Sequence, residues 1–339
     1  MSQLPVKIPS SSTTPRLRIG IIADVQHAPI DDGFSYSGTP RYYRHAISAA
    51  SSAARKFQST SCDFAIDLGD VIDGQCANLP SGPDPVLTSI SQALSAYEGE
   101  WFHTYGNHEM YCFDRQTIGE RLGVPFVREE TGDLVGYYSI QKSDYRFIFL
   151  DNYDETVLSR TGPKKAAAEQ ILSKKNPNYA KGDINSPYPG TGLNRRFVAF
   201  NGGIGPTQMN WLRSQLELAR KRGEKVVVSS HQPLHPKTTA PICLPFNYPE
   251  ILKLLQKFND VVVLTLSGHT HSNGYIESKG IHHIVVPAAL ESKPPIQTFA
   301  ILEIYEDRIE VLGEGDCQSG TIMLEETGEK GGKRKRKGK

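Results

Sequence analysis

Six short apolar runs, each followed at once by polar residues, place the strongest constraint on how this chain folds. Runs of this length, bounded by glycine and polar residues, are typical of strands that are covered on both faces of a sheet. The polar residues would then lie at the carboxyl ends of the strands, where open α/β sheets keep their active sites. The predicted strands, with the residues that follow them, are Leu17–Ala23 before Asp24, Phe64–Leu68 before Gly69-Asp70, Trp101–Tyr105 before Gly106-Asn107, Phe147–Leu150 before Asp151, Val226–Ser230 before His231, and Val261–Ser267 before Gly268-His269.

Helical patterns lie between these runs. Arg41–Phe57 is rich in alanine and arginine, Pro206–Arg222 follows a glycine with proline in its first turn, and Pro249–Phe258 carries leucines and isoleucine on one face. Strands that alternate with helices predict a layered α/β architecture. Because the polar residues run from position 24 to position 271, a domain boundary between them would divide the site, so we predict a single domain.

Four segments do not fit this alternation. Gly74–Asp84 is loop-like, and residues 152–205 form a long stretch rich in proline, glycine and asparagine, which we interpret as a cap over the site; a disordered insertion is the alternative. Residues 1–16 and 325–339 are predicted to be disordered. The basic run Lys333–Lys337 in the second of these is a nuclear localisation signal, a contact for anionic polymers, or a solvated tail.

Composition points to an ordinary globular protein of the cytosol. A hydrophobic content of 38% and a net charge of +1 give no general argument for binding nucleic acid or a membrane. The five cysteines are scattered and form no CxxC pair, which favours a reduced intracellular protein. The N-terminus lacks an apolar signal segment, and no run is long enough to cross a bilayer. We expect a cytoplasmic monomer, with a nuclear location open through the basic tail.

The polar residues after the strands predict a centre for two divalent cations. A shared carboxylate holds two cations about 3.5–4 Å apart, the spacing that two-metal hydrolysis needs. Asp70 is the candidate for this bridge, because it follows a strand and a glycine that lets the backbone turn. Asp24 and Gln26 lie two residues apart in an extended loop and are predicted to hold the first cation together with His271.

The second cation is assigned to Asn107, His231 and His269, again with Asp70. Carboxylate, carboxamide and imidazole ligands without a thiolate favour Mn²⁺ or Mg²⁺ over a structural Zn²⁺. The sequence therefore predicts a hydrolase with two Mn²⁺ ions, for which Mg²⁺ is the substitute, acting on a phosphorus centre.

His108 directly follows a predicted ligand and is expected to face the space above the metals. We assign it to the leaving-group side, as a general acid or as a positive charge against the transition state. The nucleophile would be a water whose pKa the two metals lower. Taken singly, each motif is an ordinary turn or a surface histidine; their joint order after predicted strands is what indicates a metal site.

Five motifs together resemble the calcineurin-like metallophosphoesterase superfamily. That family has a four-layer αββα sandwich, so the resemblance changes our simple layered sheet into two mixed sheets flanked by helices. The motifs are Asp24-x-Gln26, Gly69-Asp70-x-x-Asp73, Gly106-Asn107-His108-Glu109, His231, and Gly268-His269-x-His271.

Gln26 departs from the family's usual first motif, in which histidine occupies that position. This replacement is similar to the manganese-dependent ADP-ribose/CDP-alcohol diphosphatases, and the resemblance covers about residues 17 to 315. The further strings that look like this subfamily are Asp31-Asp32-Gly33-Phe34, Arg41-Tyr42-Tyr43-Arg44-His45, Asn185-Ser186-Pro187, Phe200-Asn201-Gly202-Gly203, Cys243-Leu244 and Gly280-Ile281-His282-His283.

The resemblance implies Mn²⁺-dependent cleavage of the diphosphate bond in ADP-ribose or CDP-alcohols such as CDP-choline and CDP-glycerol. The products would be a nucleoside monophosphate and a phosphorylated alcohol or sugar. Phe34, Tyr111, Phe200 and Cys243 are the hypothetical pocket for the substrate. Three alternatives remain: a phosphomonoesterase or protein phosphatase, a cyclic-nucleotide phosphodiesterase on the same metal site, and a non-catalytic scaffold.

Overall fold

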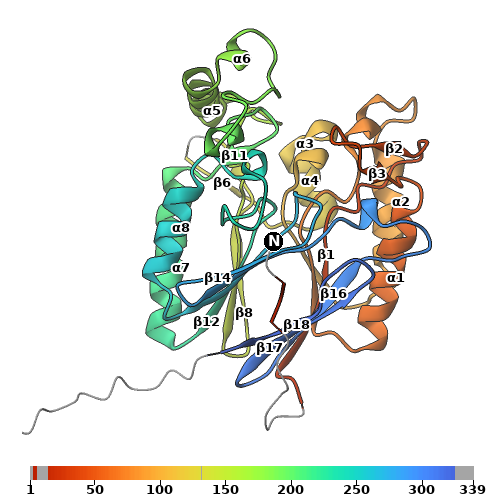
Figure 1. The fold of residues 1–339 in the computed structure, drawn as a ribbon, viewed down its shortest axis with the longest axis vertical. Helices are drawn as coiled ribbons and strands as arrows, with labels where there is room; N and C mark the ends of the chain where they lie inside the picture. The colour runs from red at the N-terminus through yellow and green to blue at the C-terminus, as the bar shows by residue number, and fades with distance from the viewer. Residues whose placement is uncertain (1–2, 6–13, 131, 325–339) are drawn as a thin grey trace, which may run out of the picture.

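The computed structural model describes residues 3–5, 14–130 and 132–324, and two six-stranded sheets occupy its centre (Figure 1). The first sheet has the order β18-β17-β16-β1-β4-β5, in which β1, β4 and β5 are parallel and the other strands antiparallel. Its strands are β18 (Gly320–Met323), β17 (Arg308–Glu314), β16 (Phe299–Ile304), β1 (Leu17–Ile22), β4 (Phe64–Asp67) and β5 (Glu100–His103).

The second sheet has the order β14-β15-β13-β12-β9-β8, with a parallel centre and one antiparallel strand at each edge. Its strands are β14 (Gly274–Ser278), β15 (Ile281–Val285), β13 (Val262–Ser267), β12 (Lys225–Ser229), β9 (Tyr145–Phe149) and β8 (Tyr138–Lys142). The sheets pack through aromatic side chains, as in the edge-to-face contact of Phe64 with Phe147 at 5.0 Å between ring centroids.

Helices cover the outer faces of both sheets. Figure 1 shows α1 (Ala46–Ser59) and α2 (Asp84–Leu94) outside the first sheet, and α7 (Pro206–Arg222) and α8 (Tyr248–Lys257) outside the second. The helix α7 has the predicted bounds, because proline begins it and Gly223, at φ 70°, ends it in the left-handed conformation. The four-layer αββα sandwich that the resemblance implied is therefore confirmed.

Short elements surround one edge of the sandwich. They are β2 (Gly33–Phe34), β3 (Pro40–Arg41), η1 (Gly74–Asn78), α3 (Asn107–Cys112), α4 (Arg115–Leu122), β6 (Val127–Arg128), β7 (Leu134–Val135), η3 (Pro241–Cys243) and η4 (Ala289–Glu291).

Two predicted elements differ from the structure by more than two residues or in type, whereas the other predicted ends are shifted by at most two residues. The helix expected at Arg41–Phe57 begins only at Ala46, because Arg41 pairs with Gly33 in a hairpin and the N–H of Tyr42 donates to Leu290 O. The stretch Gly74–Asp84, predicted as a loop, contains η1, and α2 begins at its last residue.

Residues 152–205 contain regular structure of their own. The segment holds β10 (Glu155–Thr156), α5 (Gly162–Lys175), α6 (Pro177–Ala180), η2 (Leu193–Arg196) and β11 (Gly202–Gly203). Ala168 and Leu172 of α5 pack with Phe197 and Phe246 in a small apolar cluster that is separate from the main core. In Figure 1, α5 and α6 stand above the sheets, at the upper left.

The ends of the described chain extend the first sheet. β18 lies beyond residue 315 and pairs with β17, and the N–H of Thr321 donates to Pro5 O at 2.7 Å. Leu4 is buried in the main core, so the structure differs from the predicted disorder at residues 3–5. Residues 6–13 and the basic tail 325–339 lie outside the described residues. No described helix is long and apolar enough to cross a membrane.

Candidate metal centre

Strand ends from both sheets meet at one site. Asp24 and Asp70 follow β1 and β4 of the first sheet, whereas His231 and His269 follow β12 and β13 of the second. The prediction that these polar residues collect at the carboxyl ends of strands is confirmed, although the strands belong to two sheets.

The backbone at the site is unusual. Five of the predicted ligands have left-handed φ values, which non-glycine residues rarely adopt. They are Asp24 (50°), Gln26 (42°), Asp70 (61°), His269 (65°) and His271 (62°). Such conformations cost of order 1–3 kcal/mol each and collect at functional sites, where the surrounding structure holds them.

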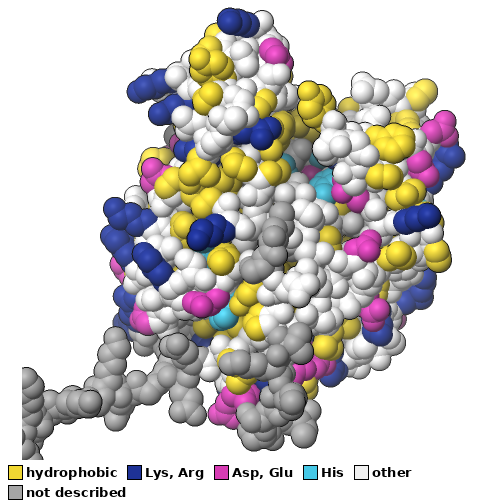
Figure 2. All heavy atoms as spheres, viewed as in Figure 1, with side chains coloured by type: hydrophobic (Ala, Val, Ile, Leu, Met, Phe, Trp, Pro, Cys, Tyr) yellow, Lys and Arg dark blue, Asp and Glu magenta, His cyan; other side chains and the backbone are white. Residues whose placement is uncertain are grey.

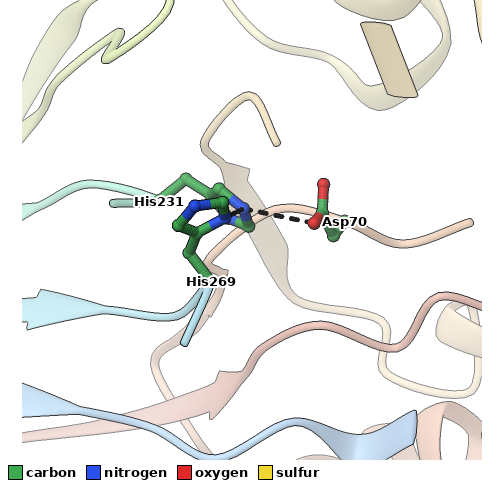
Figure 3. Close-up of side chains that lie close together, drawn as sticks. All are labelled: Asp70, His231 and His269. Atoms are coloured by element: carbon green, nitrogen blue, oxygen red, sulfur yellow. Dashed lines mark hydrogen bonds and ion pairs between the residues drawn. The ribbon is translucent and has the colours of Figure 1, made fainter. Parts of the chain in front are cut away.

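Asp70, His231 and His269 point toward one another (Figure 3). His231 Nε2 lies 3.2 Å from Asp70 Oδ2 and 3.1 Å from His269 Nδ1. One ligand atom from each residue lies within 4.8 Å of the other two, and all three residues are buried or nearly so. This separation suits three ligands of one cation.

A second group lies on the other side of Asp70. Gln26 Nε2 is 3.3 Å from Asp70 Oδ2 and 2.8 Å from His271 Nε2, and His271 Nε2 is 3.5 Å from Asp24 Oδ1. The same Asp70 oxygen thus contacts both groups, which is the position that a bridging carboxylate needs.

Asn107 and His108 complete the set from the N-terminus of α3. Asn107 Oδ1 accepts a hydrogen bond from the hydroxyl of Tyr153 at 3.1 Å. His108 lies between two carboxylates, with Nδ1 at 3.1 Å from Asp73 and Nε2 at 4.0 Å from Asp70. Burial lowers the pKa of His108, but these carboxylates outweigh it and raise the pKa above its usual value.

The donor atoms fit divalent cations. Asp24 Oδ1 and Gln26 Oε1 are buried and have no hydrogen-bond partner, which is costly unless another ligand satisfies them. Burial also raises the pKa of Asp24, as expected for a carboxylate taken out of water without full compensation. Oxygen and imidazole donors without a thiolate suit Mn²⁺ or Mg²⁺.

Each of the three imidazoles has its second nitrogen held by an oxygen. His231 Nδ1 lies 2.7 Å from Leu68 O, His269 Nε2 lies 3.3 Å from Asn201 Oδ1, and His271 Nδ1 lies 2.7 Å from Glu291 Oε1. An N–H donated to such an oxygen fixes the tautomer and leaves the other nitrogen free for a metal.

The hypothetical pocket residues surround the cluster to different degrees. The Phe200 ring is 6.1 Å from that of His269, and the Tyr111 ring is 5.5 Å from that of His108. Cys243 ends η3, where burial raises the pKa of its thiol. Phe34 differs from these residues, because it lies on the β2–β3 hairpin and is 72% exposed. In Figure 2 a histidine side chain (cyan) is visible in the recess between the upper-left and right-hand parts of the surface.

Sequence reasoning did not assign roles to Tyr153, Asn201 or Glu291. Tyr153 follows a predicted strand, as the other site residues do, and Asn201 belongs to the motif Phe200-Asn201-Gly202-Gly203 that resembles the subfamily. These local signals marked the two residues but did not indicate what either of them does. Glu291 gave no such signal, because its contact with His271 forms only in the folded chain.

Comparisons with known proteins agree with this geometry. Residues 17–273 match the family model described as calcineurin-like phosphoesterase. The chain is 36% identical to the manganese-dependent ADP-ribose/CDP-alcohol diphosphatase of Oryza sativa subsp. japonica, over 93% of this chain and 96% of that protein. It is 33% identical to the human protein of the same name, over 90% of this chain and 92% of that protein.

A solved structure is also similar. The crystal structure of a dimetal phosphatase from Danio rerio superimposes with a TM-score of 0.86 at 32% identity, over 92% of this chain and 100% of that one. The chain therefore belongs to the calcineurin-like phosphoesterase family, in the group of the manganese-dependent ADP-ribose/CDP-alcohol diphosphatases.

Proposed function

We propose that this protein is an Mn²⁺-dependent hydrolase that cleaves the diphosphate bond of ADP-ribose and of CDP-alcohols such as CDP-choline and CDP-glycerol. The products are a nucleoside monophosphate and a phosphorylated sugar or alcohol. The observation that carries this proposal is the position of Asp70 Oδ2, which contacts one group of ligands through Gln26 and a second through His231. The names of the relatives supply the substrate class.

In this proposal Asp24, Gln26 and His271 hold one cation. Asn107, His231 and His269 hold the other cation, and Asp70 is shared. Two bound cations would neutralise the diphosphate and make a water acidic enough to attack phosphorus.

His108 then supplies a proton to the leaving oxygen. Its Nε2 faces Asp70 and the cluster, while Nδ1 faces Asp73. The N–H of Gly74 donates a hydrogen bond to Nδ1 at 2.8 Å and fixes the orientation of the ring. The Asp70 and Asp73 carboxylates raise the pKa of His108, which favours the charged form that can donate a proton.

We also propose that residues 152–205 cap the site. β11 directly follows Phe200 and Asn201, so the end of this segment is anchored beside His269. A cap that limits access suits a small nucleotide-linked substrate better than a phosphoprotein, which needs an open groove. We also propose that the protein is a cytoplasmic monomer. All five cysteines are described and are free thiols, which agrees with a reducing compartment. Light scattering after gel filtration measures the mass and so tests whether the protein is a monomer.

The first test is hydrolysis by the purified full chain with Mn²⁺ or Mg²⁺. We expect release of AMP from ADP-ribose and of CMP from CDP-choline, with Mn²⁺ giving the higher rate. Turnover of only a phosphopeptide or a cyclic nucleotide would keep the metal site and contradict the substrate class. Metal binding with no turnover of any substrate would favour the scaffold.

His108→Ala tests the catalytic assignment. We expect kcat for ADP-ribose to fall by about 10²–10⁴-fold, the usual contribution of a positioned general acid. His282→Ala is the matched control, because this histidine stacks on Tyr275 at the edge of the second sheet; it should leave kcat unchanged. Equal kcat values in His108→Ala and the wild type would remove His108 from the mechanism.

A further inference from the structure

Arg41 lies beside the metal centre with an incomplete set of partners. It ends the β2–β3 hairpin, which the Tyr42 N–H ties to η4 through Leu290 O at 2.9 Å. Its Nε is buried and makes no hydrogen bond, and Glu291 Oε1 is 3.6 Å away, too far for one. Glu291 already accepts from His271 at 2.7 Å, so Arg41 keeps most of its capacity to donate hydrogen bonds.

A shallow cavity of about 270 Å³, widely open to solvent, lies at this arginine. His108 and Tyr111 form the wall nearest the metal centre, since His108 Nε2 is 4.0 Å from Asp70. The charge of Arg41 also acts on His108, where it opposes the effect of the carboxylates. The complete lining is Arg41, Asp73, Gly74, Gln75, Asn78, His108 and Tyr111.

The charges in this cavity suit an anionic group. Asp73, the carboxylate in the lining, is already paired with His108 at 3.1 Å and accepts a hydrogen bond from the N–H of Gln75 at 2.9 Å. Arg41 is the lining's one arginine, and the lining contains no lysine. A guanidinium with free N–H groups binds phosphate oxygens in pairs, with charge-assisted hydrogen bonds that are about twice as strong as neutral ones.

We propose that Arg41 binds the leaving phosphate of a diphosphate substrate in this cavity. The inference rests on the proposed function and adds the site for the second phosphate. The attacked phosphate would lie on the metal centre and the second phosphate beside His108, so that both phosphates meet positive charge.

The step is balanced. The water oxygen forms a bond to the attacked phosphorus, and the bond from that phosphorus to the bridging oxygen breaks. The bridging oxygen leaves on the second phosphate with the electron pair and takes a proton from His108, while the proton of the attacking water passes to solvent. Arg41 stabilises the negative charge that develops on the leaving group.

Arg41→Gln tests this with two substrates in the full chain. ADP-ribose carries the second phosphate, whereas bis(p-nitrophenyl) phosphate carries only the phosphate that is attacked. For ADP-ribose we expect kcat/KM to fall by about tenfold to a hundredfold, the effect of losing a charged hydrogen bond. For bis(p-nitrophenyl) phosphate it should change less than about threefold on the same reasoning, and Arg41→Lys should restore part of the loss with ADP-ribose.

A structural role for Arg41 gives a different pattern. If Arg41 acts only by orienting Glu291 and thereby His271, the variant loses activity on both substrates alike and needs more Mn²⁺ in direct binding titrations. That result, or an unchanged kcat/KM for ADP-ribose, would overturn the inference. Arg44→Gln is the matched control, because Arg44 is exposed and pairs with Asp31. Failure of the proposed function is distinct, since the wild type itself would then not cleave ADP-ribose.

Discussion

At the scale of single residues, Glu291 determines which nitrogen of His271 is free for a metal. Glu291 Oε1 lies 2.7 Å from His271 Nδ1, which leaves Nε2 beside Asp24 and Gln26. Replacing Glu291 by Ala removes the acceptor, so the ring can rotate or change tautomer. We expect the affinity for Mn²⁺ to fall by about 10–100-fold, the usual effect of losing such a partner. Titration calorimetry with Mn²⁺ measures it.

The control for this prediction is Glu291→Gln. Glutamine keeps an oxygen that accepts from Nδ1 but loses the charge, so most of the affinity for Mn²⁺ should remain. Equal losses in the Ala and Gln variants would mean that the charge of Glu291, and not its acceptor oxygen, supports the site.

The site residues that the sequence predicted are marked by their immediate neighbours in the chain, whereas the residues that it missed are marked only by contacts with distant parts of the chain. The side chains proposed as ligands were found because each follows a strand-like run within a few residues, so the pattern is local. Glu291 and Tyr153 act through contacts with residues 20 and 46 positions away, which no local pattern records. The placement of the predicted ligands in one cluster agrees with the prediction, while their roles stay proposals.

At the scale of elements, the packing of α1 on β1 fixes the strand that precedes Asp24. Gly20 of β1 faces the ring of Phe57, and a Cβ at this glycine would lie only 2.4 Å from that ring. Gly20→Ala should therefore destabilise the protein by about 1–3 kcal/mol, the usual cost of overpacking a core. Urea unfolding monitored by circular dichroism gives this change in the free energy of unfolding.

Two further variants separate overpacking from a general effect of alanine. Gly190→Ala should change stability by less than about 0.5 kcal/mol, because a Cβ there meets nothing within 4 Å. Phe57→Leu combined with Gly20→Ala should cost less than the sum of the two single changes, since the smaller side chain makes room. Strict additivity would show that these residues do not press on each other.

Element boundaries followed the sequence where local chemistry sets them. The helix α7 matched its prediction because proline and glycine mark its ends. The predicted start of α1 was wrong because two contacts hold the preceding residues outside the helix. Arg41 pairs with Gly33 in the hairpin, and the N–H of Tyr42 donates a hydrogen bond to Leu290 O, far along the chain. The antiparallel strands β16, β17 and β18 of the first sheet were also not predicted. Their place in the sheet depends on the pairing of β1 with β16, as in Leu17 with Ile304, and no local pattern records a pairing between residues so far apart in the sequence.

At the scale of the whole molecule, the metal centre joins the two sheets. Asp24, Gln26 and Asp70 come from loops of the first sheet, and His231 and His269 from loops of the second. The charges of these groups act on one another. Burial lowers the pKa of His231, but the Asp70 carboxylate beside it outweighs burial and raises that pKa to about 10. Burial and the charge of His231 lower the pKa of His269 well below its usual value.

Removing the metals should therefore weaken the whole domain and not only the loops. A cation that binds the folded chain alone stabilises it by RT ln(1 + [L]/Kd), about 2.7 kcal/mol at a concentration 100 times Kd. We expect Mn²⁺ to raise the Tm of the metal-free protein by several degrees in scanning calorimetry, and a chelator to reverse the rise. Asp70→Asn keeps the shape of the shared ligand but removes its charge, so its Tm should respond far less to Mn²⁺. An equal response in this variant and the wild type would mean that the stabilising Mn²⁺ binds elsewhere, because a bridging carboxylate cannot lose its charge without weakening both cations.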